Sequence, residues 1–325
     1  MKKRISLVAP FYNESGNVLE FFRRVALMAT RLPQYDFEII AVNDGSRDAT
    51  WTELLEARAR YPGVHLIDLS RNFGKEAALT AGLDRAHGDA VVPIDSDLQH
   101  PPELLEQMLA QWEQGAEVVL ARRTDRASDG FVQKLSATSF YRFHNRISQI
   151  QVPLNVGDFR LMDRRVVDAL RQLPENHRFM KGLFAWVGFR TVTIPYAHSE
   201  RHAGISSFNF WKLWNLALEG ITSFSTAPLK IWTYVGLGVS VLALLYAALI
   251  VVKTLVFGVD LPGYASLMAG MMLLGGVQLI GIGVLGEYVG RIYHEVKRRP
   301  VYLVREEHAA ADTDQTNSGS RIERA

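Results

Sequence analysis

The stretch VVPIDSDLQHPPELL, residues 91–105, contains the features from which the fold can be predicted. It begins with a short apolar run, passes through two carboxylates at Asp95 and Asp97, and ends in a helical pattern. Pro101 and Pro102 suit the first turn of a helix, where no backbone N–H donor is required. The stretch therefore predicts a buried strand, a charged loop and a helix in direct succession.

The same succession recurs through the first two thirds of the chain. Apolar runs rich in β-branched residues alternate with helical patterns, which is typical of a mostly parallel sheet covered on both faces. The fold class is therefore predicted to be α/β. The expected strands are residues 5–10, 37–42, 64–69, 89–95 and 117–121, and the expected helices are residues 17–31, 48–60, 75–86 and 102–114.

Polar residues follow each of the five expected strands. Parallel strands end at the same edge of a sheet, and ligands bind at that edge, so these residues are expected to form one site. No GxGxxG or Walker A sequence accompanies them, which argues against dinucleotide and P-loop sites. The polar segments are YNES (12–15), NDGS (43–46), SRNFGK (70–75), DSD (95–97) and ARR (121–123).

Asp95 and Asp97 are two residues apart, so an extended backbone directs both side chains to the same face. Such a pair favours a cation between the carboxylates, and hard oxygen ligands select Mg²⁺ or Mn²⁺, with substrate phosphates as further ligands. We expect this pair to hold the metal, and Gln99 and His100 to contact the substrate or support the site. Taken in isolation, the pair would suit a helix cap and a surface charge.

The overall composition excludes several classes of function. The chain has no cysteine, which excludes disulfides, thiolate metal sites and cysteine nucleophiles. Its formal net charge of +2 is close to balance, so the total charge says nothing about a polyanionic partner. No nucleic-acid partner is expected. The apolar run in the opening MKKRISLVAPFYNES is too short for a signal peptide, so we expect the first strand there.

Two uncharged segments, residues 231–252 and 264–286, are each long enough to cross a bilayer core. Basic residues lie beyond both outer ends, whereas the loop between the segments carries only Lys253. This distribution places both termini and the first domain in the cytoplasm of a multi-pass inner-membrane protein, with a short periplasmic hairpin. Glycines in the second segment suit close helix packing in lipid.

Two amphipathic stretches, residues 131–150 and 206–224, are expected to lie in the membrane surface, although a core-facing helix has the same pattern. The polar tail at 306–325 is expected to be disordered and is assigned no chemistry. The expected organisation is a catalytic domain at 1–205, an interfacial helix and linker at 206–229, two spans at 230–290, and a basic segment with the tail at 291–325.

Five motifs, in this order and spacing, resemble family 2 glycosyltransferases with the GT-A fold: VAPFYNE, VNDGSRDAT, SRNFGKEAALTAG, DSDLQHPPELL and GDFRLMDRR. The segments ERHAGISSFNFWKL and LGEYVGRIYHEVKRRP narrow the resemblance to bacterial polyprenyl-phosphate glycosyltransferases, similar to bactoprenol glucosyltransferases of the GtrB type. The resemblance covers residues 4–304. Many relatives have lysine where this chain has Ser207, so a phosphate contact by that lysine is not carried over.

The resemblance implies a nucleotide-sugar donor, with Asp44 near the base and Asp95 and Asp97 holding the metal at the diphosphate. Arg71 and Lys75 would also contact the donor, although both would equally suit a solvated surface. The implied donor-binding residues are Pro10, Tyr12, Glu14, Asp44, Arg71, Lys75, Asp95 and Gln99. The implied phosphate or acceptor contacts, among which guanidinium groups suit phosphates, are Arg122, Arg123, Arg201, Gly204, Ser206 and Ser207.

Asp158 is the catalytic base that the resemblance implies, with Arg201 as a second catalytic residue. A phosphate monoester has a second pKa of about 6 and is mostly dianionic at neutral pH, so the acceptor barely needs a base. Asp158 would then instead orient the acceptor or stabilise positive charge that develops on the sugar.

The expected function is inverting transfer of a single glucose from UDP-glucose to undecaprenyl phosphate at the cytoplasmic face, giving a lipid-linked sugar for surface polysaccharide modification. The expected partners are the UDP-sugar, undecaprenyl phosphate, the lipid bilayer and further copies of the chain. One alternative is the same reaction with mannose, galactose, an N-acetylhexosamine or a modified arabinose. Another is a membrane-anchored nucleotide-sugar sensor without turnover.

Overall fold

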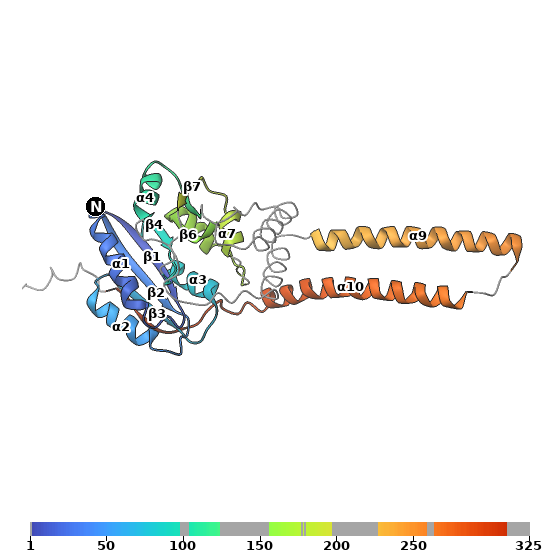
Figure 1. Cartoon of the computed structure of the whole chain (residues 1–325), viewed down its shortest axis with the longest axis horizontal. Helices are drawn as coiled ribbons and strands as arrows, with labels where there is room; N and C mark the ends of the chain where they lie inside the picture. Colours follow the sequence, from blue (N-terminus) through green and yellow to red (C-terminus); the bar gives the residue numbers. More distant parts are fainter. Residues whose placement is uncertain are drawn as a thin grey trace, which may run out of the picture. The chain divides into compact units, whose positions relative to one another are not determined.

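The computed structural model describes residues 2–97, 104–123, 156–196 except 177 and 179, 227–258 and 263–310. The chain divides into two compact units (Figure 1). The first unit is built around a β-sheet and the second includes two long helices. The first comprises residues 1–141, 151–209 and 300–325, and the second comprises residues 142–150 and 210–299.

An eight-stranded sheet forms the centre of the first unit, with the strand order β7-β5-β6-β4-β1-β2-β3-β8. Strands β1 to β4 pair in parallel, which confirms the predicted mostly parallel α/β sheet. The strands are β1 (Lys3–Phe11), β2 (Tyr35–Asn43), β3 (Val64–Leu69), β4 (Ala90–Pro93), β5 (Val118–Arg123), β6 (Val156–Asp163), β7 (Thr191–Tyr196) and β8 (Val304–His308).

Strand β6 lies between β4 and β5 and is antiparallel to both. The two reversals cancel, so β5 runs in the same direction as β4 and ends at the same edge of the sheet. The five expected strands correspond to β1 to β5, and their polar ends therefore share one edge. Strands β6, β7 and β8 were not among the expected strands.

Helices cover both faces of the sheet because β1 and β2 present apolar side chains on both sides. Helices α1, α2 and α4 share one buried cluster with Leu7 and Ala9 of β1. Helix α3 packs on the opposite face, where Gly82 lies so close to Val8 that a side chain there would overlap it. The helices are α1 (Val18–Thr30), α2 (Thr50–Arg60), α3 (Lys75–Arg85), α4 (Leu105–Glu113), α6 (Arg164–Arg171) and α7 (Met180–Trp186).

Strand β8 joins the edge of the sheet from the far end of the chain, antiparallel to β3. This corrects the expectation of a disordered tail from residue 306, because Glu306, Glu307 and His308 belong to a strand. Glu307 in this strand forms an ion pair with Arg85 and a hydrogen bond with His65, and no local apolar pattern in the sequence indicates these contacts. Residues 311–325 lie outside the described residues.

The second unit includes helices α9 (Ala227–Phe257) and α10 (Tyr264–Val296), which contain the two predicted spans. Both helices are long and apolar enough to cross a membrane by length and composition. Their apolar side chains are almost entirely exposed within the chain, as expected for surfaces that face lipid. Gly281 of α10 lies directly against the Trp232 ring of α9, so a small residue permits this contact. The amphipathic stretches 131–150 and 206–224 lie outside the described residues.

Candidate active site

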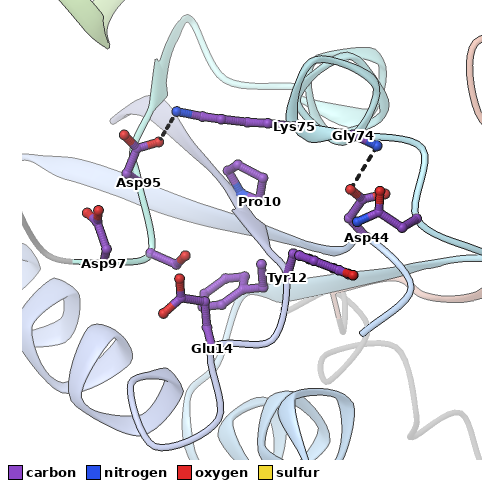
Figure 2. A pocket seen from close by; sticks show the side chains of 11 residues that line it. Pro10, Tyr12, Glu14, Asp44, Gly74, Lys75, Asp95 and Asp97 are labelled. Carbon is purple, nitrogen blue, oxygen red and sulfur yellow. Dashed lines mark hydrogen bonds and ion pairs between the residues drawn. The ribbon is translucent and has the colours of Figure 1, made fainter. Parts of the chain in front are cut away.

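A pocket of about 250 Å³ opens at the edge where the parallel strands end. Figure 2 shows Asp95 and Asp97 at one end of this pocket and Asp44 at the other, with Pro10 and Tyr12 between them. The lining residues come from the ends of β1, β2, β3 and β4 and from the start of α3. They are Pro10, Phe11, Tyr12, Glu14, Asp44, Asn72, Gly74, Lys75, Asp95, Ser96 and Asp97.

The turn after β1 is fixed to the turn after β2. The Asn13 backbone N–H donates to Ser46 Oγ over 3.0 Å, and the Arg47 N–H donates to Asn13 Oδ1 over 2.9 Å. The Glu14 N–H donates to Thr50 Oγ1 at the start of α2. These bonds hold Tyr12 and Glu14 in place at the pocket wall without using their side-chain oxygens.

Asp44 directly follows β2 and is buried, with an exposed fraction of 2%. Its two carboxylate oxygens accept the backbone N–H groups of Phe73 and Gly74 over 2.7 and 2.9 Å. Burial raises the pKa of Asp44, and these two hydrogen bonds oppose the rise. The carboxylate therefore organises the loop after β3, and its remaining lone pairs are available to a ligand.

Gly45 explains why the turn after Asp44 has the sequence NDGS. Its φ is +63°, in the left-handed region that favours glycine, and a Cβ atom there would overlap the backbone of Arg71 and Asn72. The turn after β2 and the loop after β3 can therefore pack backbone against backbone.

Lys75 forms ion pairs with Asp95, a candidate metal ligand, and with Asp158, the candidate base. Its Nζ lies 2.7 Å from Asp95 Oδ1 and 2.7 Å from Asp158 Oδ2. Burial would lower the pKa of Lys75, but the two carboxylates outweigh burial and raise it. A cation thus bridges Asp95, which follows β4, and Asp158, which lies in β6, so the two predicted carboxylates meet at one positive charge.

Asp95 and Asp97 fit a hard divalent cation. Both line the same pocket wall and supply oxygen ligands, and the Lys75 ammonium on Asp95 Oδ1 shows that this carboxylate accepts a cation. No group of three or more His, Cys, Asp or Glu side chains converges on a metal position in the described part of the chain. Two protein carboxylates supplemented by phosphate oxygens and water suit Mg²⁺ or Mn²⁺.

Asp158 lies in β6, with Arg160 two residues further along the strand. Burial alone would raise the pKa of Asp158, but the charges of Lys75 and Lys181 outweigh burial and lower it. Its Oδ1 is buried and has no hydrogen-bond partner in the part of the chain that the structure describes. An anionic oxygen kept without a donor is suited to accept a proton or to face a developing positive charge.

Two further titratable groups surround Asp158. Burial and the nearby Asp158 charge raise the pKa of Glu76 to about 7. Burial lowers the pKa of Arg160 to about 10, against the opposing effect of Asp158 and Glu76, and its guanidinium lies 3.9 Å from the centre of the Phe184 ring. Neither residue was predicted as a site residue from the sequence. Glu76 has the pattern of an ordinary acidic residue in the first turn of a helix, and Arg160 has that of a residue within a strand.

The structure brings seven predicted residues into one pocket: Pro10, Tyr12, Glu14, Asp44, Lys75, Asp95 and Asp97. Arg71 is not among the lining residues; its guanidinium stacks 3.9 Å above the Phe73 ring. Arg122 is exposed near the end of β5, and Arg123 is the last residue of that strand. The remaining predicted residues lie outside the described ones: Gln99, Arg201, Gly204, Ser206 and Ser207.

Four pocket residues were missed from the sequence: Phe11, Asn72, Gly74 and Ser96. Phe11 is the last residue of β1. Asn72 and Gly74 stand within the SRNFGK segment, and Ser96 stands between the two aspartates. A signal was therefore present for Asn72, Gly74 and Ser96, because each belongs to a polar segment that follows an expected strand.

Comparison with known proteins gives matches along most of the chain. The family model described as Glycosyl transferase family 2 matches residues 6–171, and that described as GtrB C-terminal hairpin matches residues 227–292. A bactoprenol glucosyl transferase of Shigella phage SfV is 52% identical over 304 residues, covering 94% of this chain and 99% of the relative. A prophage bactoprenol glucosyl transferase homolog of Escherichia coli K12 is 49% identical over 302 residues, covering 93% and 98%.

Solved structures match at lower similarity. A mannosyltransferase of Pyrobaculum calidifontis, solved in complex with GDP-Man and Mn²⁺, is 16% identical, with a TM-score of 0.47. The match covers 92% of this chain and 87% of that one.

Proposed function

This chain belongs to glycosyl transferase family 2, and from that premise we propose that it transfers one glucose from UDP-glucose to undecaprenyl phosphate. The observation that carries the proposal is the pocket where Asp44, Asp95 and Asp97 meet, in a chain that also has two membrane-length helices. The relatives are named bactoprenol glucosyl transferases, which supports both the sugar and the polyprenyl acceptor. The chain is a glycosyltransferase, as the sequence motifs predicted.

UDP would occupy the pocket with its base towards Asp44 and its diphosphate towards Asp95 and Asp97. The lone pairs of Asp44 that do not face Phe73 and Gly74 can accept a uracil N–H. Asp95 and Asp97 would hold Mg²⁺ or Mn²⁺, which as a Lewis acid offsets the charge on the departing UDP. Lys75 would then retain Asp158 as its second partner and keep that carboxylate ionised.

The reaction is a single displacement. An oxygen of the lipid phosphate attacks the anomeric carbon of glucose while the bond from that carbon to the UDP oxygen breaks. Attack from the face opposite UDP inverts the configuration, so an α-linked donor gives a β-linked lipid product. Asp158 lies beside Lys75 and Asp95, where it either accepts the last proton of a monoanionic phosphate or stabilises positive charge on the sugar.

The membrane helices would hold the catalytic domain at the lipid acceptor, on the cytoplasmic side. The positive-inside rule favours that side, because basic residues flank the two apolar spans there. They are Lys230 in the first turn of α9, Arg291 near the end of α10, and Lys297, Arg298 and Arg299 directly after α10. A reporter fused to the C-terminus should be active in the cytoplasm, and a periplasmic C-terminus would overturn this orientation.

The deciding experiment uses the full chain in nanodiscs with radiolabelled UDP-glucose, undecaprenyl phosphate and Mg²⁺. We expect label in the extracted lipid and a β-anomeric product by NMR. A panel of other nucleotide sugars identifies the donor if glucose is not transferred. Binding of nucleotide sugars without lipid product from any of them would contradict the transfer reaction and favour a sensor.

A further inference from the structure

The chain returns to the catalytic unit after its second membrane-length helix. Residues 302–308, which we call the return segment, include the edge strand β8, which pairs with β3. The Ser70 backbone N–H donates to the Leu303 carbonyl over 2.9 Å at the point where β3 ends. The return segment therefore reaches the loop of residues 70–74, which supplies Asn72 and Gly74 to the pocket.

Arg305 makes the contact that connects the return segment to this loop. Its Nη1 lies 3.2 Å from Asp68 Oδ2, and its Nη2 donates to the Ser70 carbonyl over 2.6 Å. One guanidinium thus holds the last residues of β3 and the first residue of the loop. The planar fork of arginine suits two such acceptors, whereas lysine offers a single ammonium.

Asp68 connects Arg305 to the turn after β2, because it contacts both Arg305 and Asn43. This carboxylate is only 2% exposed, and its other oxygen accepts Asn43 Nδ2 over 2.7 Å. Asn43 Oδ1 in turn accepts the Ser46 hydroxyl, which receives the Asn13 N–H. A buried carboxylate requires partners of this kind, because leaving its charge unpaired is costly.

The nucleotide end of the pocket rests on this network. Asp44 follows Asn43 in the chain, and its carboxylate receives the N–H groups of Phe73 and Gly74 from the loop that Arg305 holds. Arg305 itself does not line the pocket. Its influence on a bound nucleotide therefore passes through Asp68 and Ser70 to Asp44 and the loop.

We propose that Arg305 is a positioning residue for the nucleotide, which it serves by holding the 70–74 loop and the end of β2 in their binding geometry from the return segment. The assignment rests on the proposed function in that the nucleotide is UDP. It gives the segment after the second membrane helix a role in donor binding.

A contact directly after the return segment provides a matched control. Arg58 Nη2 donates to the carbonyl of Ala309, the residue that follows the segment, over 2.9 Å. Arg58 belongs to α2, and among the described residues its side chain bonds to Ala309 and not to the 70–74 loop. Loss of Arg58 should loosen the segment without disturbing the loop.

The experiment compares Arg305→Met, Arg305→Lys and Arg58→Met in the full chain. The measurements are the Kd of UDP by calorimetry, KM and kcat for UDP-glucose, and amide hydrogen exchange of residues 69–75. For Arg305→Met we expect Kd and KM to rise about tenfold with kcat within about twofold, the size of one lost charged hydrogen bond. Faster exchange at Phe73 and Gly74 should accompany it, Arg305→Lys should lie between, and Arg58→Met should match the wild type.

A folding defect is separated by the double variant Asp68→Asn with Arg305→Met, which leaves no unpaired buried charge. It should recover thermal stability while the Kd of UDP stays raised, because the Ser70 carbonyl still lacks its donor. An unchanged Kd in Arg305→Met, or an equal rise in Arg58→Met, would overturn the proposal. UDP binding by the wild type without lipid product would contradict only the transfer reaction, whereas absence of UDP binding would overturn both.

Discussion

The Lys75 ammonium lies 2.7 Å from the Asp158 carboxylate, although the two residues are 83 positions apart in the sequence. Lys75 is the first residue of α3 and Asp158 lies in β6. The fold therefore places the ammonium group of a helix residue beside the carboxylate of a strand residue. Because Asp95 shares the same ammonium, a change at Lys75 should reach both carboxylates.

Lys75→Met should move the acid limb of the pH–rate profile upward. Lys75 is the largest influence that lowers the pKa of Asp158 against burial, so its loss lets that pKa rise. Asp158 would then be protonated at higher pH, and activity would disappear earlier as the solution is acidified. Lys75→Arg, which keeps the charge, should leave the limb near its wild-type position. A kcat/KM profile between pH 5 and 9 measures the shift, and coincident profiles for wild type and Lys75→Met would contradict the coupling.

Asp158→Asn separates a base from a positioning residue. If Asp158 accepts the last acceptor proton, the variant should recover activity at high pH, where the lipid phosphate is already a dianion. If Asp158 orients the acceptor or stabilises positive charge, the loss should be the same at all pH values. Because its pKa is lowered, Asp158 of the wild type stays ionised at both pH 6 and pH 9. The ratio of variant to wild-type kcat at pH 6 and pH 9 distinguishes the two.

The site at the ends of the strands could be predicted from the sequence, because a polar segment follows each expected strand. The parallel topology then brings these segments to one edge of the sheet. Asp44, Lys75, Asp95 and Asp97 met in one pocket for this reason. The sequence did not predict the antiparallel insertion of β6 between β4 and β5, since pairing partners leave no local pattern.

Long-range pairs explain what else was missed. The sequence of β8, VREEH, has little apolar character, and its place in the sheet depends on partners more than 200 residues away, such as Arg85 and His65 for Glu307. The buried state of Arg160 likewise depends on Phe184 and on carboxylates from two elements. A segment read alone contains neither kind of information.

Asp97→Asn should lower the affinity for Mn²⁺ and the rate of transfer by about a hundredfold, because the metal would lose one of two protein carboxylates. Asp36→Asn is the control, since Asp36 is exposed near the start of β2 at the opposite end of that strand from the pocket. Electron paramagnetic resonance of bound Mn²⁺ in the presence of UDP measures the affinity without turnover. Equal Mn²⁺ affinity in Asp97→Asn and Asp36→Asn would remove Asp97 from the metal site.

Glu76→Gln should stabilise the protein progressively as the pH rises from 5 to 8.5. The folded pKa of Glu76 is about 7 against an ordinary value of 4.5, so its stabilising contribution is complete below 4.5 and is lost as the pH passes through 7. The loss reaches about 3 kcal/mol, from 1.36 kcal/mol per pKa unit. Glutamine does not ionise, so the Glu76→Gln variant does not lose this stability as the pH rises. Thermal unfolding at several pH values should show a growing difference, whereas exposed Glu106→Gln in α4 should give a constant one. A constant difference for Glu76→Gln would contradict the assignment.

Gly45→Ala should weaken UDP binding more than any other single-methyl change near the pocket. Alanine is strained at a φ of +63°, and its Cβ would also overlap the backbone of Arg71 and Asn72, so the loop that donates to Asp44 must move. Gly115→Ala separates the two effects, because Gly115 has a φ of +94° but only the end of the Arg190 side chain nearby, at 3.7 Å. Both variants should lose about 1 kcal/mol of stability from the backbone conformation. Only Gly45→Ala should raise the Kd of UDP, by about tenfold or more as the loop moves from Asp44. Calorimetry with UDP measures this, and equal affinities in the two variants would show that the close backbone approach is not needed for the nucleotide.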